Sequence, residues 1–254
     1  CIAGVMSLND ALKLVAARGK LMQNCPRGSM LSVRIAAEEV EKRLPAELSI
    51  AAVNGPQLCV VAGNTEAITK LQAELEKEEI ICKPLHTSHA FHSPMMDEIV
   101  EPFHEIVKSV KLNAPAIQIC STVTAQNMSA DQATDPMYWA RHLRATVRFA
   151  EGVQTLWKEN NQAVLLECGP RTTAATLARQ QAADVKKQVA VSSLSDNAND
   201  DAEWQAILFA LGQLWLNGVS IDWNKFYGHE KRIKIGLPTY AFDHKRYWID
   251  PPLK

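Results

Sequence analysis

The chain has 254 residues, of which 47% are hydrophobic and 22% are charged, and its formal net charge is −1 at pH 7. This composition is typical of a soluble globular protein with one large domain, or with one domain and appendages. Because the charge is nearly neutral, no bulk electrostatic force favours a nucleic acid or a membrane surface as partner. No apolar run approaches the ~18 residues of a membrane span, and no signal-peptide pattern opens the chain. The six cysteines are scattered and lie mostly in apolar runs, so we expect a cytoplasmic protein with reduced thiols.

The first predicted element is an amphipathic helix over residues 7–23. Ser7 is placed to cap this helix, with Asp10 three residues further on. The pattern predicts an apolar stripe made of Leu8, Leu12, Val15, Gly19 and Met22. Pro26 and Gly28 then end the helix.

The next segment, residues 30–86, alternates between strand and helix patterns. Strands are predicted over residues 30–35, 48–53, 57–62 and 80–85, and helices over residues 36–44 and 65–78. The two middle strands are joined at Asn54-Gly-Pro56, which is a strong turn signal. Strand-helix-strand-strand-helix-strand is the order of a split β-α-β, ferredoxin-like unit, so we expect a small inserted subdomain here.

From Met96 onward the helical period returns. Pro102 interrupts it, so we expect a kink or a break at that residue. Further strands are predicted over residues 116–121 and 163–168, and further helices over residues 136–143, 149–159 and 170–180. Alternating strands and helices indicate an α/β sheet core.

Beyond about residue 183 the sequence changes character. Residues 192–201 are polar and acidic, as in a linker, and an exposed amphipathic helix follows, marked by Trp204, Ile207, Leu208, Leu211, Leu214 and Trp215. The tail from Tyr240 to Trp248 is aromatic and basic, a pattern found in proteins that bind single-stranded nucleic acid. Because the chain is neutral overall, we favour docking of these side chains onto a neighbouring protein surface.

Three histidines, His86, His89 and His92, lie close together between two prolines. We expect no metal there, because this segment cannot form a helix that gathers all three rings and it contains no carboxylate or cysteine. Imidazole titrates near neutral pH and can activate a hydroxyl nucleophile, so a general base is one interpretation. A loop histidine with only local hydrogen bonds is the other.

Arg18 lies beside the apolar stripe of the first helix. It is either a solvated helix charge or a guanidinium that binds a carboxylate through two hydrogen bonds. The residue pattern alone leaves both interpretations open.

Several motifs follow one another in an order known from one family. They are Ala51-Ala-Val-Asn-Gly-Pro56, His89-Ala-Phe-His-Ser-Pro-Met-Met96, Tyr138-Trp-Ala-Arg-His-Leu143, Val147-Arg-Phe149 and Glu167-Cys-Gly-Pro170. Together with the run Ala3–Gln23, they resemble the malonyl-type acyltransferase domains of type I modular polyketide synthases. The tail Leu237-Pro-Thr-Tyr-Ala-Phe242, with Arg246-Tyr-Trp248, is similar to the linker that follows such domains.

The resemblance implies an α/β-hydrolase-like core with an inserted ferredoxin-like subdomain and a C-terminal extended linker. Residues 1–29 and 87–183 would form the large subdomain, residues 30–86 the small one, and residues 184–254 the linker. It also implies that a serine takes a malonyl group from coenzyme A and passes it to the phosphopantetheine thiol of an acyl carrier protein. No tightly bound cofactor is implied. The expected partners are this carrier protein and, through the linker, an adjacent ketosynthase domain.

The resemblance also implies roles for five residues. His92 matches the catalytic histidine of the family, and Arg18 matches the arginine that binds the malonyl carboxylate. His89 and Phe91 belong to the malonyl-selecting form of the motif, in which Phe91 fills the space that an α-methyl group needs. Asn54 lies where the family lines its active site, and no residue is implied as a metal ligand.

The start of the chain departs from the family pattern. The G-H-S-x-G-E turn that carries the nucleophilic serine is expected just before Cys1, and neither Ser7, Ser88 nor Ser93 lies in such a turn. We therefore expect that the chain alone does not transfer acyl groups. Two alternatives stay open, namely methylmalonyl or another acyl unit as substrate, and a non-catalytic domain retained for docking in a multidomain synthase.

Overall fold

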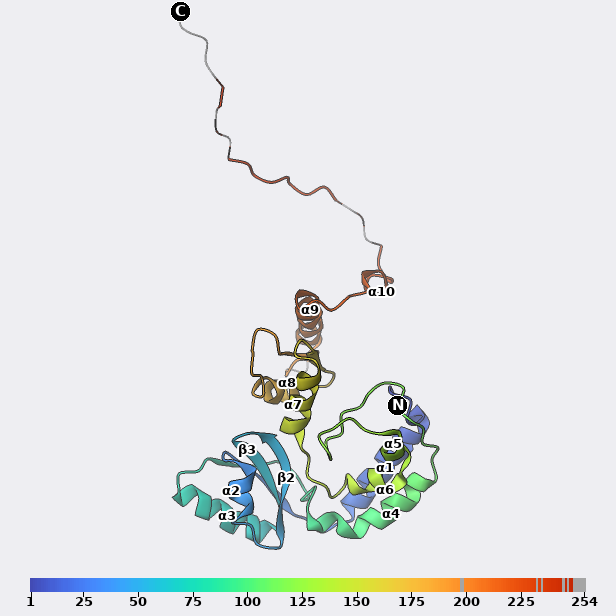
Figure 1. Cartoon of the computed structure of the whole chain (residues 1–254), viewed down its shortest axis with the longest axis vertical. Coiled ribbons are helices and arrows are strands. Elements are labelled where there is room, and N and C mark those ends of the chain that lie inside the picture. Colours follow the sequence, from blue (N-terminus) through green and yellow to red (C-terminus); the bar gives the residue numbers. More distant parts are fainter. Residues whose placement is uncertain (197–198, 232, 234, 244, 246, 249–254) are drawn as a thin grey trace, which may run out of the picture.

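The computed structural model describes residues 1–196, 199–231, 233, 235–243, 245 and 247–248, so Arg246 of the predicted linker motif lies outside the described residues. The fold is mixed α/β (Figure 1). Its helices are α1 (Leu8–Gln23), α2 (Ala37–Glu41), α3 (Thr65–Lys77), α4 (Asp97–Lys108), α5 (Ala130–Thr134), α6 (Pro136–Arg141), α7 (Phe149–Glu159), α8 (Thr173–Arg179), α9 (Asp200–Leu216) and α10 (Trp223–Phe226), with a short 3-10 helix at Pro94–Met96. Its strands are β1 (Ser29–Val33), β2 (Leu48–Gly55), β3 (Leu58–Gly63), β4 (Cys82–Pro84), β5 (Val164–Glu167) and β6 (Val189–Ser192).

A four-stranded sheet occupies residues 29–84, with the order β2-β3-β1-β4 and antiparallel pairing throughout. The predicted order of strands and helices in this segment is confirmed. The last strand is shorter than predicted, because the chain first completes the turn that ends α3. There Glu79 adopts a positive φ of 61°, and the amide of Ile80 donates to the carbonyl of Leu75.

The two faces of this sheet are covered differently because successive side chains of a strand point to opposite sides. On one face, Leu31, Val33 and Val61 pack with Ile68 and Leu71 of α3. The opposite face carries a second apolar cluster, made of Met30, Ala51, Val60, Ala62 and Ala90 with Phe91 and Met95 beside it. The histidine-containing segment therefore covers the sheet face that α2 and α3 leave open.

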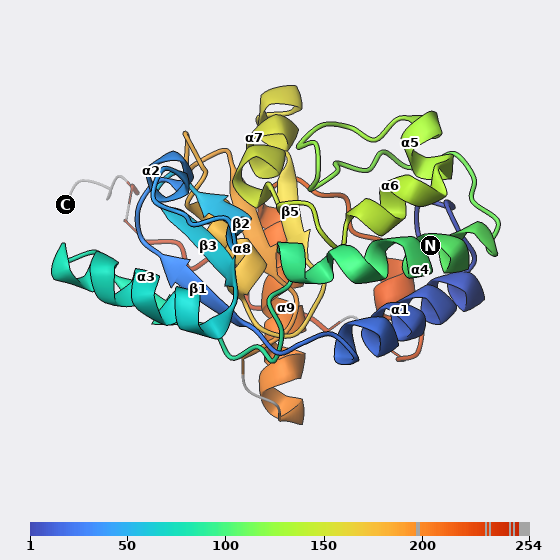
Figure 2. The ribbon, with the colours of Figure 1, turned by 90° about the horizontal axis from the view of Figure 1, so that it is seen from below.

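Helices α1, α4 and α6 pack together next to the sheet (Figure 2). The Ser7 cap of α1 is confirmed, since its side chain accepts a hydrogen bond from the amide of Asp10. Of the predicted apolar stripe, Met22 is buried, at 8% exposed, but Leu8, Leu12 and Val15 are 65%, 59% and 67% exposed, and Leu14, which the stripe left out, is 6% exposed. The helix is turned so that Leu14 and Met22 meet the apolar side of α4.

Helix α4 continues through Pro102 without the break that we considered. A proline removes one backbone hydrogen bond from a helix. The buried side chains of Ile99, Phe103 and Val107 lie on one face of α4 and are packed in a common cluster, which offsets that loss.

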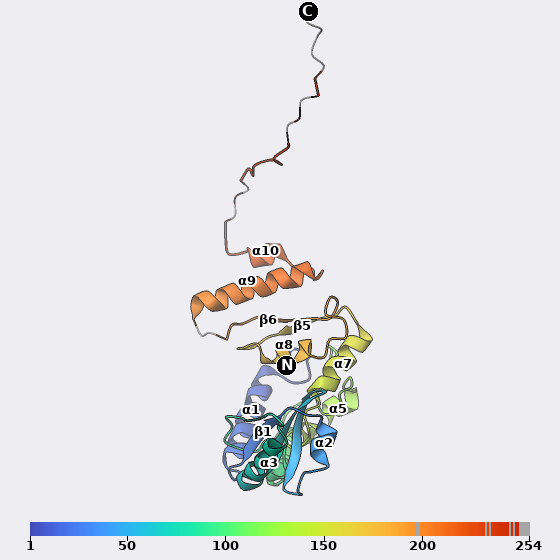
Figure 3. The same cartoon turned by 90° about the vertical axis from the view of Figure 1, so that its left-hand side faces the viewer.

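Above these layers, β5 and β6 pair in parallel and contact α8, while α9 crosses β6 (Figure 3). Helix α9 agrees with the helix predicted around Trp204 to Trp215, whereas the strand at residues 189–192 was not predicted. The strand predicted over residues 116–121 is wrong, since only an isolated bridge joins Cys120 to Asn127. Within the described ranges, no helix is both long and apolar enough to cross a membrane.

Candidate active site

A cavity of about 580 Å³ lies between α1, the open face of the sheet and the histidine-containing segment. Helix α1, strands β1 to β3 and the segments around residues 85–92 and 147 all line it. Three of the five predicted site residues border this cavity, namely Arg18, Phe91 and His92. The fold therefore brings the guanidinium of Arg18 next to an imidazole and an aromatic ring that lie more than seventy residues further along the sequence.

His92 has a left-handed backbone, with a φ of 57°, which is uncommon for a residue other than glycine. Two hydrogen bonds hold the turn around it. The hydroxyl of Ser49 on β2 donates to the carbonyl of His92 over 3.2 Å, and the fully buried hydroxyl of Ser93 donates to the carbonyl of Ala90 over 2.6 Å. The turn is thereby fastened both to the sheet and to itself.

The partner of the His92 ring is supplied by a segment that runs along β2. Val147 accepts from the amide of Val53 over 2.8 Å and donates to the carbonyl of Ala51 over 2.9 Å. This pairing places the carbonyl of Ala145 at 2.8 Å from Nδ1 of His92. Strand β2 therefore positions both the backbone of the histidine and the acceptor for its ring.

The hydrogen bond fixes which ring nitrogen of His92 carries the proton. A carbonyl can only accept, so Nδ1 is protonated and Nε2 is a free acceptor in the neutral ring. Burial lowers the pKa of His92, and the Arg18 charge lowers it further, against the opposing effect of the carbonyls of Ala145 and His142. The ring is therefore neutral at neutral pH and can take a proton on Nε2.

Arg18 borders the same cavity from α1 and is partly buried. Burial lowers the pKa of its guanidinium, which still remains charged at neutral pH because the usual pKa is so high. Among the described residues, no hydrogen bond or ion pair engages the Arg18 side chain. A partly buried guanidinium without a counter-ion is suited to binding an anionic group, such as a carboxylate, through two parallel hydrogen bonds.

His89 does not border the cavity. It is 4% exposed, and both of its ring nitrogens have partners, since Nδ1 lies 2.8 Å from the hydroxyl of Ser88 and Nε2 lies 3.1 Å from the carbonyl of Cys25. Its ring lies 6.1 Å from that of Phe91, centroid to centroid. Phe91 therefore lies between His89 and the cavity as the neighbour of both.

Asn54 does not border the cavity either. Its carbonyl accepts a hydrogen bond from the side-chain amide of Gln181 over 3.0 Å, at the end of β2. Ala52, two residues earlier on this strand, lines the cavity instead. Asn54 was expected in a turn, whereas it lies near the end of β2, beyond the part of that strand that lines the cavity.

Two residues near the site were not singled out from the sequence. Thr87 lines the cavity with a buried hydroxyl that has no partner among the described residues. His142 lies beside Arg18 in a second cavity, of about 210 Å³, and burial with the Arg18 and His92 charges lowers its pKa to about 4. In the sequence, His142 is marked only as part of the Tyr138–Leu143 motif. No rule of residue spacing links His142 to Arg18.

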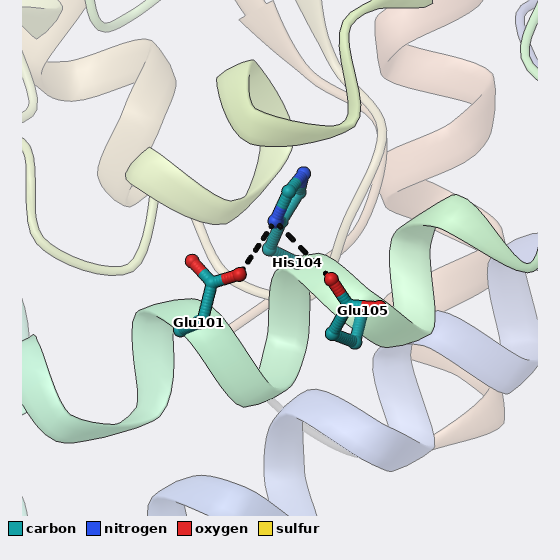
Figure 4. Close-up of side chains that lie close together, drawn as sticks. All are labelled: Glu101, His104 and Glu105. Atoms are coloured by element: carbon teal, nitrogen blue, oxygen red, sulfur yellow. Dashed lines mark hydrogen bonds and ion pairs between the residues drawn. The ribbon is translucent and has the colours of Figure 1, made fainter.

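In the described part of the chain, one group of side chains could in principle hold a metal ion. It lies outside the cavity. Glu101, His104 and Glu105 come close together on the surface of α4 (Figure 4). Nδ1 of His104 lies 3.1 Å from Glu101, and Lys108 lies 2.8 Å from Glu105 and lowers the pKa of that carboxyl. Ion pairs of this kind, one turn apart on an exposed helix, account for the cluster without a bound ion.

With this geometry in view, the family can be stated. The chain belongs to the acyl transferase domain family, whose model matches residues 1–220. Among curated proteins, it is 36% identical to polyketide synthase GfsA of Streptomyces halstedii, over 98% of this chain and 3% of that protein. It is also 36% identical to mycoketide-CoA synthase of Mycobacterium tuberculosis, over 98% of this chain and 6% of that protein. The chain thus spans a small part of these relatives.

Solved structures give the same family. The acyltransferase domain from the second module of the salinomycin polyketide synthase is 35% identical with a TM-score of 0.85, over 94% of this chain and 56% of that one. The acyl transferase domain of SpnD, solved in complex with 2-(pent-4-yn-1-yl)malonyl, is 37% identical with a TM-score of 0.80, over 86% of this chain and 53% of that one.

Proposed function

We propose that this chain is part of a polyketide synthase acyltransferase that moves a malonyl extender unit from coenzyme A to an acyl carrier protein. The observation that carries this proposal is the pairing of two groups in one cavity. His92 offers an unprotonated Nε2, and Arg18 offers a cation that has no counter-ion among the described residues. Malonyl-CoA presents the two complementary groups, a thioester and a free carboxylate.

In this proposal, His92 acts as the general base and then as the general acid. Its Nε2 takes the proton of a serine hydroxyl as the serine oxygen attacks the thioester carbonyl, and it returns the proton to the departing coenzyme A thiol. In the second half, Nε2 takes the proton of the phosphopantetheine thiol, whose sulfur attacks the acyl-serine ester, and the proton returns to the serine. Ala145 stabilises the imidazolium of each half-reaction through the bond at Nδ1.

We propose that the attacking serine is not one of the residues of this sequence, and that this sequence alone transfers no acyl group. Among the described residues that line the cavity, the one hydroxyl belongs to Thr87. Its segment is not a strand-to-helix turn, since residues 85–87 follow β4 and no helix begins directly after them. Thr87 is therefore poorly suited to act as the nucleophile.

The substrate class is inferred from Arg18 and Phe91. A charged acyl group left without a partner in a partly buried site is costly, so a guanidinium at this place favours a dicarboxylic acyl unit. Phe91 borders the cavity and reduces the room next to the acyl chain, which favours malonyl over methylmalonyl. The related SpnD domain, solved with a substituted malonyl ligand, supports a malonyl-type substrate for this cavity.

We further infer that residues 30–86 form a ferredoxin-like subdomain inserted into an α/β-hydrolase-like core made of residues 1–29 and 87–183. The strand order β2-β3-β1-β4 with antiparallel pairing supports the first part, and the parallel pair β5-β6 supports the second. Exposed aromatic side chains, among them Tyr240, Phe242 and Trp248, support docking of the C-terminal segment onto an adjacent ketosynthase domain.

Loading of radiolabelled malonyl-CoA onto a synthase polypeptide that contains this sequence and the chain before Cys1 tests the function. His92→Ala is expected to lower the loading rate by ~10²–10⁴-fold, the usual contribution of a general base. His86→Ala is the matched control, because this imidazole is exposed and belongs to the same segment. Normal loading by His92→Ala would refute the assigned role, and a wild-type protein that loads no acyl group would refute the function itself.

A further inference from the structure

The short segment between His142 and Ala145 touches both functional groups of the proposed site. The carbonyl of Ala145 accepts the hydrogen bond from Nδ1 of His92. The side chain of His142 borders the second cavity together with Arg18. Arg18 itself belongs to the walls of both cavities, so this one residue borders the space in front of His92 and the space in front of His142.

The His142 ring is held in one orientation by aromatic neighbours. Its plane lies at 16° to that of Trp139, with 5.7 Å between centroids, and Tyr138 meets it edge-on at 5.1 Å. These neighbours are themselves fixed, because the Trp139 indole N–H donates to the carbonyl of Ala133 over 2.9 Å and the Tyr138 hydroxyl is hydrogen-bonded to Ser121. Nε2 of His142 therefore points in a direction that the packing determines.

That nitrogen is buried and has no hydrogen-bond partner within the described ranges. Leaving a buried polar atom unpaired is costly, so such atoms in folded proteins normally find a partner when the site is complete. The remaining walls of this cavity are apolar, made by Met6, Ala11, Leu14, Val15, Phe103, Trp139 and Leu143. Among the described side chains that make up the rest of this wall, Arg18 has hydrogen-bond donors with no partner, whereas the indole N–H of Trp139 already donates to the carbonyl of Ala133.

We propose that His142 is a positioning residue, whose Nε2 accepts a hydrogen bond from the Arg18 guanidinium when that guanidinium holds the carboxylate of an acyl group. This inference rests on the proposed function and adds to it the means by which the guanidinium is oriented. A guanidinium has five N–H donors, and a carboxylate bound through two oxygens uses two of them. The hydrogen bond to His142 uses a third N–H donor, so it does not compete with the two hydrogen bonds to the carboxylate.

The protonation state of His142 suits this role. Only the neutral ring can accept on Nε2, and a protonated ring would place a second cation beside Arg18. Burial, together with the charges of Arg18 and His92, lowers the pKa of His142 to about 4, so the ring is neutral at neutral pH. With the proton of the neutral ring on Nδ1, as the proposal requires, Nε2 is an acceptor and the ring adds no charge that would compete for the substrate carboxylate.

The kinetic test compares two substitutions in the synthase polypeptide. His142→Phe keeps an aromatic ring against Trp139 but removes the acceptor, whereas His142→Gln keeps a polar acceptor of similar reach. We expect His142→Phe to lower kcat/KM for malonyl-CoA by about tenfold, which corresponds to about 1.4 kcal/mol, and to leave acetyl-CoA loading within about twofold. His142→Gln is expected to recover most of the malonyl activity. Equal losses with both donors, or no loss with malonyl-CoA, would overturn the proposal.

A spectroscopic test does not depend on acyl transfer. Histidine ¹⁵N resonances distinguish a protonated from an unprotonated Nε2, and malonate serves as the carboxylate probe. At neutral pH we expect Nε2 of His142 to be unprotonated and to shift when malonate saturates the wild-type protein, with no such shift in Arg18→Met. A protonated Nε2, or a resonance that does not respond to malonate, would contradict the inference even if malonyl loading proceeds. Absent loading with a normal Nε2 response would instead remove only the proposed function.

Discussion

The lowered pKa of His142 predicts a defined loss of stability in mild acid. In the unfolded chain its pKa is about 6.5, and in the folded protein it is about 4. Between these values the unfolded state binds more protons, so the free energy of unfolding falls as the pH falls. Each pH unit below 6.5 removes about 1.36 kcal/mol, so the 1.5 units from 6.5 to 5 remove about 2 kcal/mol, and the loss levels off near pH 4.

Urea unfolding of the wild-type chain and of His142→Phe at pH 8 and pH 5 measures this contribution. Other groups titrate in the same range, and they include His92, whose lowered pKa acts in the same direction. They are common to both proteins, so the difference between the two pH dependences isolates His142. The free energy of unfolding of the wild type is expected to fall by about 2 kcal/mol more than that of the variant. Parallel pH dependences would show that His142 titrates normally and would refute the account of its burial.

Two further predictions concern the close packing at Gly28 and the side chain of Phe91. A Cβ at Gly28 would lie 2.7 Å from Cβ of Ala90 and 2.9 Å from the carbonyl oxygen of Gly63, so Gly28→Ala is expected to lower the free energy of unfolding by about 1–3 kcal/mol. Gly212→Ala in α9, where no atom lies within 4 Å, is the control and should be neutral or stabilising in the same urea titration. Phe91→Ala is expected to raise the preference for methylmalonyl-CoA over malonyl-CoA by ~10- to 200-fold in a competition between the two donors. An unchanged ratio would exclude Phe91 as the selecting residue.

Local sequence patterns predicted the strand-helix unit well. Two apolar runs form the strands β2 and β3 as predicted, although the turn between them lies at Pro56 and Gln57, and Asn54 and Gly55 still belong to β2. The sequence period also predicts the buried face of helix α3, since Ile68, Leu71 and Leu75 recur at helical spacing and are all buried. In these elements the period of the sequence agrees with the tertiary contacts.

Where the packing is not local, the pattern was insufficient. In α1 the period correctly predicted a helix and the burial of Met22, but it missed Leu14, because only the position of α4 selects that residue over Leu12 and Val15. Residues 116–121 contain apolar residues, yet their backbone bonds are made with scattered partners such as the carbonyl of Ala3 and the amide of Met128. A strand requires a continuous neighbour, and a sequence pattern does not reveal whether one is present.

In the candidate site, too, residue types could be predicted from the sequence, but the contacts between distant residues could not. His92 was a candidate base from its residue type, but its Nδ1 partner is a backbone carbonyl 53 residues away, which no side-chain motif encodes. Arg18 was undecided from the residues, and family resemblance supplied its proposed role. His142 was not considered, because its importance depends on the burial of Nε2 and the shared cavity with Arg18.

The most direct test of the account is the dependence of acyl loading on the charge of Arg18. Malonyl-CoA and acetyl-CoA differ by the carboxylate that Arg18 is proposed to bind, and Lys20→Met, an exposed change on the same helix, is the control. Arg18→Met is expected to lower kcat/KM for malonyl-CoA by at least about 100-fold, since two hydrogen bonds to a charged group are lost, while acetyl-CoA loading is retained or improved. Equal losses for both donors, or undiminished malonyl loading, would contradict the central claim.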